Sequence, residues 1–260
     1  MFFCLSGFLV TGSALRLESI TLFMLFRILR LIPALMVEVT LSAFILGPIV
    51  TRYNLGAYFS NPLTYKYFGN IFAQLSFALP GVFVHHPTNF VNLNLWTLVP
   101  EYYCYGIVML MFIFGLFHNR KYFLLCFLQA GAIFFLLDKH EAWTDGPVNQ
   151  YLLIYASLLG TLAYLYADYV PIHKYLFILN FSLAILFFCF KETAALGVLC
   201  TAYCTIFLGM VKFPRIPFLE RGDYSYGVYL YGFPITQTIW HYAPNFRTGY
   251  VLFGLAALYA

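Results

Sequence analysis

The segment from Leu22 to Val39, LFMLFRILRLIPALMVEV, places two arginines and an acid inside an otherwise apolar run. Apolar runs of this length are typical of helices that cross a bilayer. Arg27, Arg30 and Glu38 stand out, because an ionised group in the hydrocarbon region is costly unless it is paired or reaches water. The segment indicates a membrane helix whose ionisable side chains need a specific explanation.

The composition of the whole chain also favours a membrane protein. Of its 260 residues, 62% are hydrophobic and 9% are charged, and the mean hydropathy is +0.81. A soluble domain carries roughly 25% charged residues. The 30 phenylalanines and 22 tyrosines suit lipid-facing and interfacial surfaces. We therefore expect the lipid bilayer to be a partner of this chain.

The sequence lacks the motifs of several kinds of site. It contains no phosphate-binding glycine loop, no H-E-x-x-H zinc motif, no G-x-S-x-G nucleophile and no basic patch for nucleic acid. Its six cysteines lie in apolar runs, without histidine or acid at ligand spacing. We expect no metal site and no nucleic-acid partner.

The apolar runs predict an all-α, polytopic membrane bundle, folded as a single domain over residues 1–260. Connecting loops are short, and no internal repeat is visible. A weaker run at 67–84 contains Asn70, Gln74 and Pro80 and is a candidate re-entrant segment. The nine predicted spans lie near 2–14, 31–50, 92–116, 122–138, 149–167, 175–190, 194–211, 224–241 and 248–260.

The distribution of positive charge favours a segment 67–84 that does not cross the membrane. Cytoplasmic loops carry an excess of Lys and Arg. If 67–84 does not cross, nine of the 14 basic residues lie on the cytoplasmic side; if it crosses, only six do. The cytoplasmic nine are Arg16, Arg27, Arg30, Arg120, Lys121, Lys174, Lys212, Arg215 and Arg221. This arrangement puts residue 1 outside, at the start of an apolar run, and the chain also stops inside one. We expect a chain truncated at both ends.

Arg27 and Arg30 are three residues apart, so they share one face of a helix. Pro33 follows them and leaves the carbonyl of Leu29 without its helical partner. The arginines could be a positive-inside anchor, or a docking site for a phosphate-bearing ligand that Arg16 would enlarge. Glu38 lies deeper, where a structural hydrogen-bonding role is favoured over catalysis.

Two further segments carry candidate residues. Ser6 and Gly7 are small residues that suit either helix packing or the close approach of a thin ligand, such as a pantetheine arm. Trp96 suits an interfacial anchor. Glu101, one turn into an apolar run, suits either structural pairing or substrate handling.

Histidines and tyrosines provide the remaining candidates. His85 and His86 lie in the outer loop and are either bystanders or a possible base. Tyr226 and Tyr229 belong to a tyrosine-rich helix start. They suit an interfacial belt or the lining of a site for a polar substrate.

Seven segments in order, FFCLSGFLVTGSALR, FRILRLIPALMV, AFILGPIVT, YFSNPLTYKY, LPGVF, VNLNLWTLVPEYYCYG and GDYSYGVYLYGFPITQ, resemble one family. This is the bacterial integral-membrane acyltransferase-3 family, in its O-acetyltransferase branch for O-antigen and other polysaccharides. The resemblance covers nearly the whole chain. It implies a multi-pass protein of the inner membrane that transfers acetyl from cytoplasmic acetyl-coenzyme A to a sugar hydroxyl. It implies no bound cofactor, with acetyl-coenzyme A as donor substrate.

The resemblance also implies roles for individual residues. Ser6 and Gly7 match the F-F-x-x-S-G motif, and Arg27 and Arg30 match an R-x-x-R motif expected to contact the phosphates of coenzyme A. The tryptophan and acid of the L-W-[ST]-L…E motif are Trp96 and Glu101, which makes Glu101 the candidate catalytic residue. Ser225, Tyr226 and Tyr229 match S-Y-x-x-Y; Tyr226, Tyr229 and Trp96 are the candidate substrate-binding residues.

The sequence departs from the family pattern at three places. The family has an earlier helix with a basic residue and, about ten residues on, the histidine taken as catalytic; this sequence begins after that helix. Leu93-Asn94 replaces the usual G-S, and part of the last helix is missing. We expect a chain that lacks the catalytic histidine and is inactive as it stands. The alternatives are a multi-pass transporter or flippase and a non-catalytic remnant.

Overall fold

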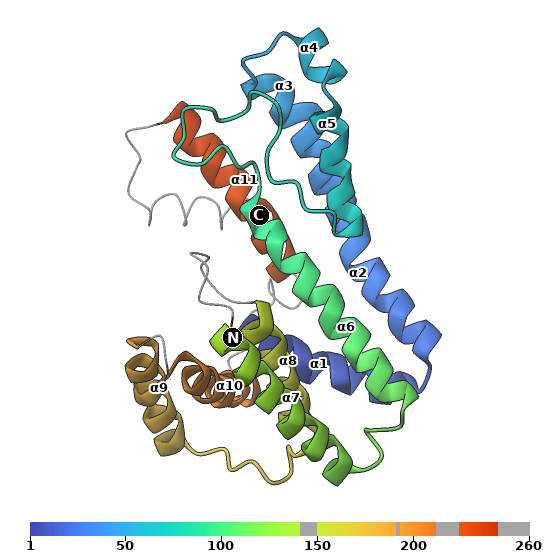
Figure 1. The fold of residues 1–260 in the computed structure, drawn as a ribbon, viewed down its shortest axis with the longest axis vertical. Helices are drawn as coiled ribbons and strands as arrows, with labels where there is room; N and C mark the ends of the chain where they lie inside the picture. Colours follow the sequence, from blue (N-terminus) through green and yellow to red (C-terminus); the bar gives the residue numbers. More distant parts are fainter. Residues whose placement is uncertain (141–149, 191–192, 212–223, 244–260) are drawn as a thin grey trace. The chain divides into compact units, whose positions relative to one another are not determined.

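The computed structural model describes residues 1–140, 150–190, 193–211 and 224–243 (Figure 1). Within these ranges every regular element is a helix and none is a strand. The prediction of an all-α fold is therefore confirmed for the described part of the chain. Eight of the nine predicted apolar runs coincide with helices, while the run at 248–260 lies outside the described residues.

The chain divides into two compact units, each built from two segments. The first unit comprises Met1–Arg27 and Val99–Phe213, and the second comprises Ile28–Leu98 and Pro214–Ala260. Each unit is described by itself below. The expectation of a single domain over residues 1–260 stays a prediction.

The first unit is a bundle in which α8 is the central element. This helix contacts α1, α7 and α10, and α10 also packs against α9 and α1 (Figure 1). The first unit holds most of α6 as well. The bounds are α1 Phe2–Leu17, α6 Leu98–Ile113, α7 Arg120–His140, α8 Gln150–Leu165, α9 Lys174–Phe188 and α10 Ala194–Met210.

Two glycines bring α1 and α8 into backbone contact. A Cβ atom at Gly7 would lie 2.0 Å from the carbonyl oxygen of Ser157, and one at Gly160 would lie 1.9 Å from that of Cys4. Between the same helices, the hydroxyls of Thr11 and Thr161 are hydrogen-bonded at 3.0 Å. Small residues at such a crossing let two apolar helices approach closely without burying an unpaired polar group.

The second unit contains most of α2, α11 and a series of short helices between them. Asn54 and Asn61 begin two of the short helices, because each side chain accepts a hydrogen bond from a backbone N–H of the first turn. The bounds are α2 Ile20–Leu41, the π-helix η1 Ser42–Leu46, α3 Gly47–Val50, α4 Leu55–Ser60, α5 Pro62–Lys66, the 3₁₀ helices η2 Tyr67–Phe72 and η3 Leu93–Thr97, and α11 Tyr224–Tyr242.

The helix that contains the opening segment starts earlier than predicted. The expected span was 31–50, whereas α2 begins at Ile20 and, through η1 and α3, continues to Val50. Arg27 and Arg30 therefore lie inside the helix, as their predicted place on one helix face requires. The apolar run marked only part of this helix, because arginine is a good helix former and its long side chain can reach water from within a helix.

Segment 67–84 forms no long helix. Its first residues make η2, which ends at Ala73 in the left-handed conformation with φ 59°, and irregular chain follows. The side chain of Asn70 closes this turn by bonding to the backbone of Tyr67 and Ser76. The segment is thus not a spanning helix, in agreement with the prediction, while its re-entrant placement stays a prediction.

Nine spans are not supported by the described residues. Two helical stretches are long and apolar enough to cross a membrane, Ile20–Val50 with 31 residues and Leu93–Ile113 with 21. Four other apolar helices have 10–17 residues. A helix of 16 residues is about 24 Å long, shorter than a hydrocarbon core of about 30 Å. The described residues therefore do not support a count of nine, because apolarity alone does not determine where each helix ends.

Candidate functional site

Arg27 is held in place by α1 and by two aromatic rings. Its Nη2 donates to the hydroxyl of Ser13 at 3.2 Å. The guanidinium carbon lies 5.7 Å from the ring centre of Phe23 and 5.9 Å from that of Tyr105, the spacing of cation–π contacts. Its Nε is buried and has no hydrogen-bond partner among the described residues. The guanidinium is thus fixed in direction while keeping donor capacity.

Arg16 and Arg27 bond to neighbouring residues of α1. Arg16 donates from Nε to the carbonyl of Gly12 at 3.1 Å, and Arg27 binds the adjacent Ser13. The first unit therefore gathers two guanidinium groups at the last turns of α1, as the predicted enlargement of the arginine patch requires. Arg30 is exposed on α2, one turn beyond Arg27.

Glu101 is buried in the first turn of α6, with 6% of its surface exposed. The phenol of Tyr105, one turn later, donates a hydrogen bond to its Oε1. The ring of the same Tyr105 faces Arg27. Tyr105 therefore links the candidate catalytic acid to a candidate donor-binding arginine. Sequence reasoning missed this residue, although its i, i+4 spacing from Glu101 is a signal for contact on one helix face.

Ser6 and Gly7 lie in α1, in the same unit as Arg27 and Glu101. The contact between Gly7 and Ser157 fills the space that the missing side chain leaves. This geometry explains Gly7 by helix packing, and it leaves no room for a ligand between Gly7 and α8. Contact of Ser6 with coenzyme A stays a prediction.

Tyr229 joins α11 to the segment before α6, within the second unit. Its hydroxyl donates to the carbonyl of Asn94 at 2.7 Å and is also paired with the hydroxyl of Thr97, while Asn94 Nδ2 donates to the carbonyl of Tyr229 at 2.7 Å. Asn94, which departs from the family pattern, is thus the partner of Tyr229 in both of these hydrogen bonds between backbone and side chain. Trp96 is half-buried on η3, and Tyr226 is buried on α11. Their contact with substrate stays a prediction.

Glu38 is the centre of a buried polar network in the second unit, with 1% of its surface exposed. Its Oε1 accepts hydrogen bonds from Asn92 and Ser42, each at 2.9 Å, and from Tyr67 at 3.5 Å. Asn92 donates in addition to the carbonyl of Leu230 on α11 at 2.9 Å. The network agrees with the structural role favoured for Glu38, since it ties α2, η2, η3 and α11 together.

Of the two candidate histidines, His86 makes specific contacts and His85 is exposed. His86 Nδ1 lies 2.7 Å from Oε1 of Gln237 on α11. His86 and Glu101 belong to different units, and the role of His85 or His86 as a base stays a prediction. Gln237 was not a candidate, and no sequence spacing connects it with His86.

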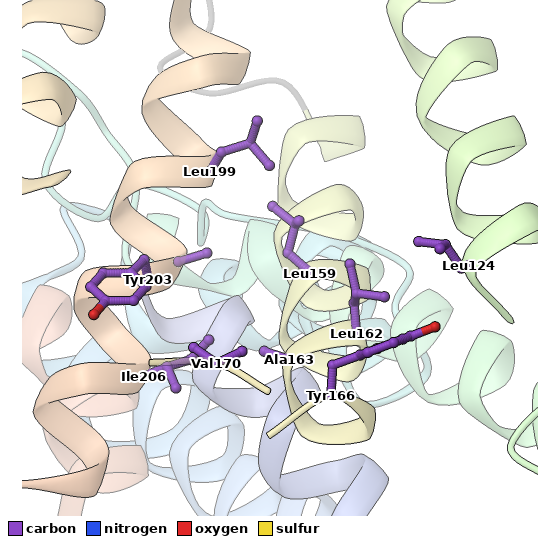
Figure 2. A pocket seen from close by; sticks show the side chains of 10 residues that line it. Leu124, Leu159, Leu162, Ala163, Tyr166, Val170, Leu199, Tyr203 and Ile206 are labelled. Carbon is purple, nitrogen blue, oxygen red and sulfur yellow. The ribbon is translucent and has the colours of Figure 1, made fainter. Parts of the chain in front are cut away.

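Each unit has an open pocket among its described residues. The pocket of the first unit has a volume of about 360 Å³ among α7, α8 and α10, and is lined by aliphatic side chains together with Tyr166 and Tyr203 (Figure 2). Both phenols are used in hydrogen bonds to backbone carbonyls, those of Arg120 and Pro171. A second pocket, of about 720 Å³, lies beside η1 and α11 and is also mainly apolar. Neither pocket presents a convergent set of polar groups.

Cysteine, histidine and carboxylate side chains do not gather into a metal site within the described part of the chain. No protein-family model matches the chain, so the acyltransferase-3 family is not confirmed, and no solved structure matches it. The chain is similar to an O-acetyl transferase of Shigella phage Sf6. The two are 28% identical over 254 residues, which cover 92% of this chain and 73% of the phage protein. This similarity over most of the chain supports an O-acetyltransferase, and hence an acyltransferase.

Proposed function

We propose that this chain is a membrane O-acyltransferase that moves an acetyl group from cytoplasmic acetyl-coenzyme A to a hydroxyl of an envelope or exported carbohydrate. The observation that carries the proposal is the similarity to the phage O-acetyl transferase over 92% of the chain. Its partners are then acetyl-coenzyme A, a carbohydrate or glycolipid acceptor and the lipid bilayer. Its place is the bacterial inner membrane, as a multi-pass protein.

The length of the helical stretch Ile20–Val50 supports a place for the arginines at the membrane surface. Its 31 residues extend about 46 Å at 1.5 Å per residue, against a hydrocarbon core of about 30 Å. If the deep end, near Val50, stays in the bilayer, the first third of the helix can reach the headgroups. Arg27 and Arg30 lie in that third, where a guanidinium escapes the cost of the bilayer centre.

The arginine cluster, Arg16, Arg27 and Arg30, is the proposed site for the phosphates of coenzyme A. Guanidinium groups offer paired N–H donors that match phosphate oxygens, and such charge-assisted bonds are strong. Arg27 supports this role best, because Ser13 and two aromatic rings orient it while its buried Nε lacks a partner among the described residues. A simple surface anchor needs no such orientation.

Glu101 is the proposed residue for handling the acceptor. An acid that is 6% exposed in an apolar helix is costly unless it is hydrogen-bonded, and Tyr105 supplies one donor. Trp96, Tyr226 and Tyr229 are the proposed acceptor-binding residues. Through Tyr105, Glu101 is connected with Arg27 of the proposed donor site within the first unit.

Binding of coenzyme A to the purified chain in detergent tests the donor site. Arg27→Ala and Arg30→Ala should each weaken binding by roughly 10- to 100-fold, the equivalent of a lost hydrogen bond to a charged group. Arg27→Lys should give an intermediate affinity, because it keeps the charge and loses the fork. Arg120→Ala is the matched control, since Arg120 is exposed and pairs with the exposed Asp168 at 3.5 Å.

Transfer itself is tested by incubating membranes that contain the chain with labelled acetyl-coenzyme A and a bacterial polysaccharide. The proposal departs here from the expectation that the chain is inactive as it stands. Its expected product is an acetyl ester on the carbohydrate, identified by mass spectrometry and removed by mild alkali. The proposal is wrong if the wild-type chain neither binds coenzyme A nor produces such an ester. If Arg27→Ala and Arg30→Ala both bind coenzyme A as well as Arg120→Ala does, the phosphates bind elsewhere.

A further inference from the structure

The loop that carries His86 is hydrogen-bonded to the end of α3 a few residues before the histidine, in the second unit. Thr51 donates from its hydroxyl to the carbonyl of Pro80 at 2.7 Å, and the N–H of Arg52 donates to the carbonyl of Gly81 at 3.1 Å. The side chains of Leu79, Val82 and Phe83 are buried just before the histidine. His86 is therefore carried by packed chain at a defined position.

Phe83 adopts a backbone conformation that bulky residues rarely occupy, with φ 52°. Its carbonyl accepts the N–H of His86 at 3.0 Å, and its ring lies 4.7 Å from the imidazole centre. Strain of this kind persists only where the surroundings enforce it, and it is concentrated at functional sites. The backbone conformation of Phe83 forms the turn before His86, and its ring packs beside the imidazole.

Gln237 determines which nitrogen of His86 carries the proton. Its side-chain amide Nε2 donates to the carbonyl of Phe90 at 3.1 Å and to the hydroxyl of Thr88 at 3.3 Å. A backbone carbonyl only accepts, so the NH₂ group must face Phe90 and Oε1 must face His86. Because Oε1 also only accepts, Nδ1 of His86 is the donor across the 2.7 Å contact. Neutral His86 then carries its lone pair on Nε2.

The second nitrogen of His86 is available to a ligand. The only hydrogen bond of its ring to another described residue is the one to Gln237, and the side chain is partly exposed. The rings of Trp240 and His241 lie 4.7 Å and 5.6 Å from the imidazole centre. Gln237 itself is 6% exposed. The buried amide of Gln237 thus orients the accessible imidazole of His86. Catalytic bases are commonly held by an orienting group in this way.

We propose that His86 is the general base that deprotonates the acceptor hydroxyl, and that Gln237 is its positioning residue. This inference rests on the proposed acetyl transfer. Nε2 takes the hydroxyl proton while the hydroxyl oxygen bonds to the acetyl carbonyl carbon of the thioester. The carbon–sulfur bond then breaks, and the thiolate takes the proton from the imidazolium. The products are an acetyl ester and a thiol, with His86 neutral again.

Other titratable and charged groups lie near this base. His86, Arg52 and His85 interact electrostatically with the neighbouring His241. A pH–rate profile therefore includes several groups, and only its change in a Gln237 variant reports on the pair of His86 and Gln237.

Substitution of His86 tests the base directly. His86→Gln can still donate to Gln237 but has no basic nitrogen, so we expect acetyl transfer to fall by about 10²- to 10⁴-fold with coenzyme A binding unchanged. His118→Gln is the control, because His118 is an exposed histidine of the first unit. The proposal is overturned if His86→Gln binds coenzyme A and transfers acetyl at the wild-type rate.

Gln237 is tested through the tautomer and the pH profile. In protein labelled with ¹⁵N-histidine, we expect the neutral His86 proton on Nδ1, and a mixture of tautomers in Gln237→Leu. Gln237→Glu keeps an acceptor for Nδ1 and should restore more transfer than Gln237→Leu, with the acidic limb of the pH–rate profile shifted to higher pH. Wild-type His86 with its proton on Nε2 would overturn the proposal without needing any variant to fold. A wild-type chain that transfers no acetyl would contradict the proposed function instead.

Discussion

Tyr105 donates a hydrogen bond to Glu101, one helical turn before it on α6. The ring of this tyrosine also lies 5.9 Å from the guanidinium carbon of Arg27 on α2. One side chain thus satisfies a buried acid with its polar end and contacts a cation with its face. The proposed acceptor-handling residue and the proposed donor-binding residue share this support.

Removing only the phenol oxygen should separate the two contacts of Tyr105. Tyr105→Phe deletes the donor to Glu101 and keeps the ring beside Arg27. We expect acetyl transfer to fall by roughly 10- to 100-fold, as a lost hydrogen bond to a charged group predicts, with coenzyme A affinity unchanged. Tyr103→Phe is the control, because Tyr103 is 55% exposed on the same helix. Equal transfer rates in the two variants would show that the bond to Glu101 does not support the reaction.

The glycines of the α1–α8 crossing should be intolerant of a single added methyl group. Gly7→Ala and Gly160→Ala would place a Cβ within 2.0 Å of backbone atoms, so the helices must separate. We expect each to lower the free energy of unfolding by about 1–3 kcal/mol, measured as a lower melting temperature in detergent.

The matched control for that prediction is Gly106→Ala. A Cβ at Gly106, in α6 of the same unit, would meet nothing within 4 Å. This change should be neutral or stabilising by up to about 1 kcal/mol, because alanine favours a helix interior. If Gly7→Ala melts at the same temperature as Gly106→Ala, the backbone contact is not present in the protein.

Asn92 should be more important to stability than an asparagine that bonds within its own helix. Asn92→Leu removes the hydrogen-bond donors to Glu38 and to the carbonyl of Leu230. Each buried acceptor that loses its donor should lower the free energy of unfolding by about 1–3 kcal/mol. Asn180→Leu is the comparison, since among the described residues Asn180 donates to Leu176, one turn away in its own helix. Denaturant unfolding of both variants in detergent measures the difference. Similar losses would contradict the linking role of Asn92.

Tyr58 should make the protein sensitive to alkaline pH. Its hydroxyl donates to the carbonyl of Ala43 at 2.8 Å, and burial raises its pKa to about 12. An unfolded tyrosine titrates near 10, so the unfolded state loses this proton first. The stabilisation from neutral Tyr58 is therefore complete below about pH 10 and is lost as the pH rises toward 12.

Unfolding measured between pH 8 and pH 12 tests this expectation. Tyr58→Phe should cost about 1 kcal/mol at neutral pH through the lost hydrogen bond, and should show a weaker decline above pH 10 than the wild type. Tyr53→Phe, at an exposed tyrosine, should leave the wild-type decline in place. Identical alkaline profiles for Tyr58→Phe and the wild type would assign the sensitivity to other groups.

Local sequence determined the helical class and most helix positions. Apolar runs predicted the positions of α1 and of α6 to α11 within a few residues, because apolar side chains in a row favour helices in an apolar solvent. The helix α2 begins eleven residues before the predicted span 31–50, since Arg27 and Arg30 interrupt the apolar run and are compatible with a helix. Motifs also located Glu101 as a buried acid, and the spacing of Tyr105 was visible in the sequence.

Only the tertiary structure decided which distant residues meet. Arg27 and Tyr105, Gly7 and Ser157, and His86 and Gln237 are far apart in the chain, and no residue periodicity relates the members of each pair. Periodicity determines which face of a helix a residue occupies, whereas the partner of that face depends on how whole helices pack. Sequence alone therefore predicted helices and candidate groups. Packing determined that Gly7 serves a helix crossing, that Tyr105 joins Glu101 to Arg27, and that Gln237 orients His86.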